Sequence, residues 1–478
     1  MTWHEAYRRH VLDPCYAHSA AHLGGYLLDA MIAHVLAVRN LSLAAAPEAQ
    51  ADIRHLLGAL ERLRTTPLAH APPTPDLYTT YVHALECEAG PRAVSYLRLG
   101  LSRNDLDMTA YRMHARELVL SLAKDLVRLR TALLAHAARH VCTVFVAQTH
   151  HRPAQPTTLA HYLAAVDAMV ERDLRRLLQA LRRLNECPLG AAALGGTSYG
   201  LDRALTARLL GFSRPVANTL DAVAASDWEL ELSGILSTVA VGLSRLVADL
   251  ISWAAGDAFV LPPTLCEGSS IMPHKRNPVA LEHVRATLAR VPAHAQATVF
   301  SSHNIPFSDH NDFGPDVQDA LTRSFAELRG AAELLAVCLE EGTFDARQLA
   351  PQDADAASTE LADHLTRCYA VPFGDAHRLV GALADRLRCA GRGLAEASPD
   401  DLTAVGGPPV PAEEIRAALN VREFVRRRCE LGGPEQGVME DHIRRATRRL
   451  HAWQERLGRI EAALRHYRDS LRYHKEVP

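Results

Sequence analysis

Apolar positions recur at three- and four-residue steps along most of the chain, which is the period of a helix that buries one face. The pattern is clearest over residues 112–140, 159–185, 227–257 and 278–299. These stretches exceed the usual helix length of ~8–20 residues, and no convincing alternating strand pattern with turn signals accompanies them. We therefore predict an all-α fold built on a bundle of long helices.

Breaks containing proline and glycine interrupt this pattern near residues 65–75, 188–200, 261–270, 305–315 and 398–411. They predict three parts: an N-terminal helical domain (1–100), a central long-helix bundle that carries the chemistry (101–349) and a C-terminal helical domain (350–478). The most apolar stretch, 232–255, is interrupted by Arg245 and Asp249. We expect it to be a buried bundle helix rather than a membrane span.

Composition narrows the class of protein. The 478 residues are 48% hydrophobic, which is ample for two or three domains. A net charge of −3 gives no reason to expect nucleic acid or an anionic membrane as a partner. Nine scattered cysteines without a C-x-x-C spacing, and an N-terminus without a basic or apolar leader, predict a cytoplasmic protein with reduced thiols.

The segment 268–278, Gly-Ser-Ser-Ile-Met-Pro-His-Lys-Arg-Asn-Pro, gathers the most chemistry in the fewest residues. It holds the hydroxyls of Ser269 and Ser270, the amine of Lys275 and the amide of Asn277. Only three of the 52 Lys and Arg residues are lysines, so a lysine here suggests a need for a compact point charge. Such a loop can close over a dianionic substrate.

A second polar cluster, Ser102-Arg103-Asn104-Asp105, stands just before a helix expected to begin near Asp107. Serine and asparagine can donate to carboxylate oxygens, and the free N–H groups at a helix start favour anions. An ordinary N-cap is the commoner explanation for such residues taken alone. Both interpretations stay open at this point.

A third polar segment, 148–158, contains Thr149, His150 and Gln155 and is expected to be a loop between two long helices. A fixed imidazole there could protonate a departing nitrogen, although a lone histidine is more often structural. Glu282 follows the 268–278 loop by about one helical turn. A carboxylate there could orient an imidazole and keep it protonated, or could simply lie on a solvated helix surface.

The 268–278 loop resembles the G-S-S-x-M-P-x-K-x-N signature of the fumarase/aspartase superfamily, and the chain as a whole resembles argininosuccinate lyases from about residue 27 to 450. The further matches are S-R-N-D at 102–105, T-H-x-x-x-A-Q-P at 149–156, P-L-G-A…G-T at 188–197, L-D-A-V-x-x-x-D at 220–227 and A-L-N…G-G-P-E at 418–435. The resemblance implies a three-part helical subunit, elimination of fumarate without metal or cofactor, and a homotetramer whose active sites draw on three subunits.

The resemblance also implies roles for individual residues. Ser269 would be the base that removes the Cβ proton, while Lys275 and Asn277 would hold the carboxylate on which charge accumulates. His150, oriented by Glu282, would protonate the leaving nitrogen. Binding of the succinyl part falls to Thr149, Ser102 and Asn104. Beyond these implied roles, we also expect Arg103, Gln155, Ser270 and Asp309 to contact the substrate.

Departures from the family concern the other end of the substrate. Where argininosuccinate lyases carry Y-N-K-D-x-Q-E-D-K, this chain has Asp309 for the tyrosine, Gly314 for the glutamine and Val317 for the lysine. Smaller departures fall at Met31, Arg98 and Leu101. The residues expected to bind fumarate are kept, and most of those expected to bind the arginine part are lost. Because each charged hydrogen bond contributes ~1.5–3 kcal/mol, this loss should weaken the binding of argininosuccinate by several kcal/mol.

We therefore predict a carbon–nitrogen lyase that releases fumarate from an N-substituted aspartate other than argininosuccinate. Two alternatives stay open: a true argininosuccinate lyase with a rebuilt arginine pocket, and a catalytically silent structural or binding relative. The order Pro-His-Lys-Arg-Asn at 273–277 is also similar to adenylosuccinate lyase, but the other motifs do not follow that enzyme.

Overall fold

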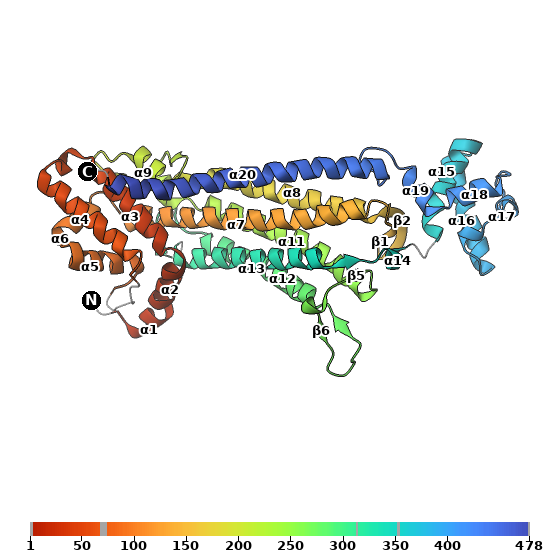
Figure 1. Ribbon diagram of the computed structural model, residues 1–478, viewed down its shortest axis with the longest axis horizontal. Coiled ribbons are helices and arrows are strands. Elements are labelled where there is room, and N and C mark those ends of the chain that lie inside the picture. Colours follow the sequence, from red (N-terminus) through yellow and green to blue (C-terminus); the bar gives the residue numbers. More distant parts are fainter. Residues whose placement is uncertain (1–2, 67–73, 312–313, 351–353, 477–478) are drawn as a thin grey trace.

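The structure is a computed structural model that describes residues 3–66, 74–311, 314–350 and 354–476. It is a long rod of near-parallel helices with a helical lobe at each end (Figure 1). The rod consists of α7 (Arg103–Arg139), α8 (Leu159–Leu184), α11 (Asp227–Ala255), α12 (Val279–Ser302), α13 (Pro315–Glu341) and α20 (Gln436–Glu476). The predicted all-α class is confirmed, and the four predicted long helices are α7, α8, α11 and α12.

The core of the rod follows from the periodic apolar positions. Leu126 of α7, Leu174 of α8 and Leu243 of α11 are completely buried in a single apolar cluster, each contributing ~1.5–3 kcal/mol when taken from water. Of the described helices, α11 taken singly is long and apolar enough to cross a membrane. It packs against α8, α12 and α13 within the rod, as expected of a bundle helix.

The N-terminal lobe surrounds the beginning of α7. It contains α1 (Glu5–Tyr7), η1 (Arg8–Leu12), α2 (Asp13–His22), α3 (Gly24–Arg39), η2 (Ser42–Ala44), α4 (Pro47–Leu63), α5 (Leu77–Ala89) and α6 (Pro91–Leu97). Short elements connect the long helices: α9 (Arg203–Leu209), α10 (Thr219–Ala224), η3 (Pro263–Leu265) and α14 (Ala346–Leu349). All nine cysteines are free thiols.

The C-terminal lobe lies at the opposite end of the rod (Figure 1) and has a small core of its own around Leu361, Leu383 and Ile415. Its elements are η5 (Ala354–Ala357), α15 (Ser358–Tyr369), α16 (Phe373–Cys389), η6 (Leu394–Glu396), α17 (Pro399–Ala404), α18 (Ala412–Ala418) and α19 (Val421–Arg426). After this lobe, α20 runs back along α7 and shares the core of the rod. The domain limits given above stay predictions.

A buried ion-pair network fixes α20 to α7 and α8. The fully buried Arg130 donates to Asp167, with Nε 2.8 Å from Oδ1, and to Glu171, with Nη2 3.1 Å from Oε2. Arg449 of α20 donates to the same Glu171 at 3.0 Å. Because a buried charge left alone is very unfavourable, each of these groups requires the others.

Strands occur only as short pairs among the described residues. They are β1 (Val144–Thr149) with β2 (Arg152–Thr158), β3 (Glu186–Cys187) with β4 (Arg214–Pro215), β5 (Phe259–Val260) with β8 (Thr343–Phe344), and β6 (Glu267–Gly268) with β7 (Arg276–Asn277). The expectation that 148–158 is a loop was wrong. Those residues belong to the antiparallel β1–β2 hairpin, in which Gln148 faces Pro153 and Thr149 faces Arg152. A two-stranded ribbon tolerates proline because each strand is also an edge.

Candidate active site

The first group of predicted site residues lies at the beginning of α7. The helix begins at Arg103 rather than near Asp107, because Ser102 and Asp105 form a capping box. Ser102 Oγ accepts from the N–H of Asn104 at 3.3 Å, and Asp105 Oδ1 accepts from the N–H of Ser102 at 3.0 Å. Ser102 is therefore the N-cap of α7.

Asp105 is the anchor of this end of the site. Its other oxygen accepts from the N–H groups of Gly190 (2.8 Å) and Ala192 (2.9 Å), and Asn104 Nδ2 donates to the carbonyl of Ala193 at 3.0 Å. Burial raises the pKa of the Asp105 carboxyl to about 6, against the lowering effect of the N–H donors. The 188–197 segment is thus held onto the start of α7, and this fixes Asn104.

A cavity of about 430 Å³ opens beside this helix start. Four of the predicted binding residues line it: Ser102, Arg103, Asn104 and Asp309. The remaining lining residues are Leu101, Asp107, Met108, Tyr111, His310, Asn311 and Gly314. The structure therefore brings the S-R-N-D turn together with the segment that departs from the family pattern.

Charge in this cavity is mostly negative. Arg103 Nη1 lies 3.0 Å from Asp76 Oδ2 and Nη2 lies 3.8 Å from Asp107 Oδ2, so the guanidinium is already paired. Burial raises the pKa of Asp107 to about 7, which Arg103 opposes and the carboxylates of Asp76 and Asp309 reinforce. Burial likewise raises the pKa of Asp309.

Sequence reasoning missed Asp107 and Tyr111 as members of this cavity. With Arg103 they stand at steps of four along α7, a spacing that places all three on one face of a helix. That signal was available in the sequence. Val317, in contrast, is completely buried within α13 and is absent from the lining of the cavity.

The second group lies at the opposite end of α7. His150 and His151 form the turn of the β1–β2 hairpin with φ of +52° and +57°, and both are exposed. Thr149 and Gln155 are exposed on the two strands. The predicted acid is therefore presented on a tight surface turn, in a backbone conformation that non-glycine residues seldom adopt.

The third group is the hairpin loop between β6 and β7, which projects sideways from the rod (Figure 1). Ser269 Oγ accepts from the backbone N–H groups of Ile271 (3.3 Å) and Met272 (3.0 Å). Ser270 and Lys275 are exposed, Asn277 is half-buried, and Ile271 keeps 85% of its surface exposed. The neighbouring Met272 keeps 42% of its surface exposed.

Glu282 lies in the first turn of α12 and is exposed. Among the residues that the structure describes, no hydrogen bond or ion pair joins it to His150. The pairing of His150 with Glu282 stays a prediction.

The three groups are far apart within one chain. The 37 residues of α7 separate Ser102 from the β1–β2 hairpin, a length of about 55 Å at 1.5 Å per residue. The β6–β7 loop projects from a third place on the rod (Figure 1). A single chain thus presents three separate parts of the predicted site.

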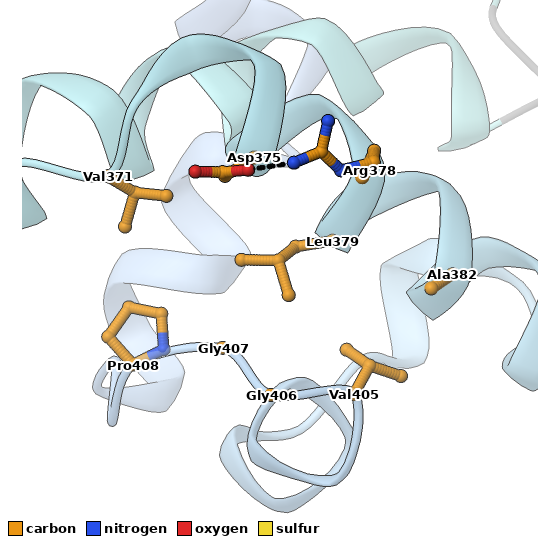
Figure 2. Close-up of a pocket in the computed structure, with 9 residues that line it drawn as sticks. All are labelled: Val371, Asp375, Arg378, Leu379, Ala382, Val405, Gly406, Gly407 and Pro408. Atoms are coloured by element: carbon orange, nitrogen blue, oxygen red, sulfur yellow. Dashed lines mark hydrogen bonds and ion pairs between the residues drawn. The ribbon is translucent and has the colours of Figure 1, made fainter.

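A larger cavity, of about 670 Å³, lies in the C-terminal lobe (Figure 2). Its walls are mainly the aliphatic Val371, Leu379 and Val405, and its only ion pair joins Asp375 to Arg378. None of the predicted catalytic residues lines it. The predicted catalytic residues therefore belong to the rod and its hairpins and not to this lobe.

Comparison with known proteins agrees with these motifs. A family model described as Lyase matches residues 86–293, and one described as Argininosuccinate lyase C-terminal matches residues 355–426. The argininosuccinate lyase of Methanocorpusculum labreanum is 34% identical over 425 residues, covering 88% of this chain and 86% of that protein. That of Methanoculleus marisnigri is 38% identical over 375 residues, covering 75% and 74%.

Among solved structures, an EDDS lyase variant with bound fumarate is similar over 100% of this chain and 96% of its own, with a TM-score of 0.83 and 25% identity. The long-helix rod and both lobes are thus shared with a lyase. Together with the matching motifs and relatives, this shows that the chain belongs to the argininosuccinate lyase family of the fumarase/aspartase superfamily and is a carbon–nitrogen lyase.

Proposed function

We propose that this protein releases fumarate from an N-substituted aspartate by β-elimination, in active sites shared between subunits of a homotetramer. The observation that carries the proposal is the environment of Ser269, whose Oγ accepts two backbone N–H groups in the loop that also holds Lys275. A serine is a poor base in water. The two N–H donors favour the alkoxide that this role requires, and the ammonium group of Lys275 in the same loop would add to this effect once the loop is closed.

The reaction balances with the predicted residues alone. The Ser269 alkoxide takes the proton from Cβ, and the developing charge spreads onto the adjacent carboxylate, where Lys275 and Asn277 stabilise it. The C–N bond then breaks, its electrons leave with the nitrogen, and the His150 imidazolium supplies the proton that yields a neutral amine. The products are fumarate and the amine. Ser269 is left protonated and His150 deprotonated, and transfer of one proton from the serine to the histidine through solvent restores the starting state.

The separation of the three parts of the site supports the proposal that subunits share it. Antiparallel association of rods would bring the beginning of one α7 next to the hairpins of other copies. Exposed apolar side chains support contact along the rod, notably Val241 on α11 and Phe300 on α12, which keep 55% and 72% of their surfaces exposed. The same association would cover Ile271 in the β6–β7 loop.

Two candidate substrates, which differ in the leaving group, are supported by different observations. The names of the relatives, at 34–38% identity, favour argininosuccinate as the substrate, and the comparisons support it better than any other substrate. The residues at the leaving-group end favour a different amine, since Asp309 and Gly314 line the cavity where the family has tyrosine and glutamine, and Val317 is buried.

The test is to follow fumarate by its ultraviolet absorbance with argininosuccinate and a panel of other N-substituted aspartates. Ser269→Ala should abolish release, and Ser42→Ala, an exposed serine of the N-terminal lobe, should not. Turnover of argininosuccinate would establish the first candidate. Turnover of another compound alone would establish the second, and no fumarate from any compound would contradict the proposal.

A further inference from the structure

A second cavity, also of about 430 Å³, adjoins the one at the start of α7. Arg103, Asp107, Tyr111 and Asn311 line both cavities and form the wall between them. The second cavity extends into the N-terminal lobe, where its lining is largely aromatic and aliphatic: Trp3, Tyr7, Val11, Leu12, Tyr16, Leu23, Leu27, Leu77 and Tyr78. A substrate held by Ser102 and Asn104 would therefore have an apolar space beyond the charged wall.

Tyr111 is the residue at the junction. Only 5% of its surface is exposed, yet its hydroxyl has no hydrogen-bond partner among the residues that the structure describes. The ring is buried, whereas the hydroxyl oxygen keeps some exposed surface at the cavities that Tyr111 lines. The hydroxyl is thus available to whatever enters the two cavities.

Tyr111 also accounts for the glycine at position 314. A β-carbon built on Gly314 would lie 3.3 Å from the Tyr111 hydroxyl, which is tighter than ordinary contact. A glutamine there would compete with the hydroxyl for the same space. The hydroxyl of Tyr111, on α7, therefore takes the place of the glutamine amide that the family has at position 314.

The charges at the junction select against a carboxylate. Asp76, Asp107 and Asp309 surround the single guanidinium of Arg103, which is already paired with Asp76 and Asp107. An incoming carboxylate would meet more negative than positive charge, whereas a cation would find the carboxylate of Asp309 on the cavity wall. The aromatic pair of Trp3 and Tyr7, with ring centroids 5.7 Å apart, adds surfaces that favour apolar or cationic groups.

We propose that Tyr111 and Asp309 select the leaving group: an amine with an apolar or cationic body that enters the aromatic-lined cavity and carries no carboxylate. This inference rests on the proposed fumarate-forming reaction and adds the substrate class. Tyr111 and Asp309 act here as specificity determinants, and the catalytic steps stay with the groups named above.

The test uses the reverse reaction, in which an amine adds to fumarate and the ultraviolet absorbance of fumarate falls. Three amines share one ring and differ in one substituent: benzylamine, 4-(aminomethyl)benzylamine as the cation and 4-(aminomethyl)benzoate as the anion. We expect kcat/KM for the cation to exceed that for the anion at least tenfold, the effect of about one charged hydrogen bond.

Two variants place the selection on the named residues. Asp309→Asn should reduce the cation-to-anion ratio about tenfold, and Tyr111→Phe, which keeps the buried ring, should raise KM for the amines with a smaller change in kcat. Asp385→Asn, an exposed aspartate of the C-terminal lobe, is the matched control and should leave the ratio unchanged. Unaltered melting temperatures would show that the variants are folded.

The outcomes separate this inference from the proposed function. An anion used as well as the cation, or a ratio that Asp309→Asn does not change, would overturn the selection. Turnover of argininosuccinate without reaction of any of the three amines would overturn it as well, while leaving the lyase activity established. Failure of every amine and every N-substituted aspartate would overturn the lyase reaction itself.

Discussion

The start of α7 and the β6–β7 loop present opposite solutions to positioning catalytic groups. At the start of α7, Asp105 is completely buried and each of its oxygens accepts backbone N–H groups. In the loop, Ser269 is held only by N–H groups of the loop itself, and Ser270 and Lys275 face solvent. The start of α7 is preorganised by contacts with the rest of the chain. The β6–β7 loop fixes Ser269 through its own backbone, but most of its other polar side chains are open to solvent.

In the proposed enzyme, this difference would divide the work between subunits. The region at the start of α7 would bind and orient the substrate, because its cavity exists in a single chain. The projecting loop carries the proposed base and carboxylate clamp, which become effective only when other surfaces exclude water. Substitutions in the two regions should therefore have different signatures.

Loss of the base should give the largest effect. Ser269→Ala should reduce kcat by at least about a thousandfold, since both proton abstraction and its coupling to charge stabilisation are lost. The melting temperature should stay within a degree or two of the parent, because the side chain is half-exposed and bonds only its own loop. A folded variant with near-normal kcat would exclude Ser269 as the base.

Loss of the buried anchor should act on stability first. Asp105→Ala leaves the N–H groups of Ser102, Gly190 and Ala192 without their acceptor, and should reduce the free energy of unfolding by roughly 3 kcal/mol. Asp202→Ala is the matched control, because that aspartate caps the exposed start of α9 and should cost about 1 kcal/mol. Equal effects of the two would contradict the anchoring role.

The cavity at α7 should also leave a pH signature. Burial raises the pKa of Asp107 to about 7 from 3.8, with Arg103 opposing and Asp76, Asp309 and Asp105 reinforcing the shift. Because the folded state holds this proton more tightly than the unfolded chain, the contribution of Asp107 to stability is greatest below pH 4 and is lost as the pH rises through about 7. The loss should be roughly 2 kcal/mol, since solvent at the cavity mouth screens part of the penalty.

Denaturant unfolding at pH 4.5, 6 and 7.5 measures this change at a fixed protein concentration. Asp107→Asn carries no titrating group and should flatten the decline, while Asp363→Asn on the C-terminal lobe should not. A slope that persists in Asp107→Asn would assign the pH dependence to other carboxyls.

The smallest expected effect concerns Ser102, which caps α7 and is also a proposed substrate contact. Ser102→Ala should cost about 1 kcal/mol of stability through loss of the cap and should also raise KM. Ser102→Asp can still cap the helix but brings negative charge to the proposed carboxylate site, so it should keep stability and raise KM more strongly. Equal KM values for both variants would leave Ser102 with the capping role alone.

Much of the fold could be predicted because long amphipathic helices leave a regular apolar period. The β1–β2 hairpin could not, since Gln148, Thr149 and Arg152 lack an apolar alternation and two prolines suggest a loop. These residues form strands because β1 and β2 pair with each other, which no local pattern of residues indicates. Two further long helices of the rod, α13 and α20, were not among the four predicted from the apolar period.

The sequence could predict which residues belong to the candidate site, but not how far apart they lie in the folded chain. Motifs named Ser102, His150 and Ser269, but no local pattern shows that α7 holds the first two about 55 Å apart. Tyr111 was missed because it lies within an apolar helical period and looks like a core residue. Its role depends on Gly314, a contact between positions 203 residues apart in sequence (314 − 111).

The central claim is that no single chain contains a complete site, and mixing two inactive variants tests it most directly. Asn104→Ala damages the start of α7 and Ser269→Ala damages the β6–β7 loop, so each homo-oligomer should be inactive or nearly so. Differently tagged copies of the two are co-expressed, and the mixed oligomers are isolated through both tags. Fumarate release by mixed oligomers that neither variant shows alone is the predicted result. Mixed oligomers that form and remain silent would contradict shared active sites.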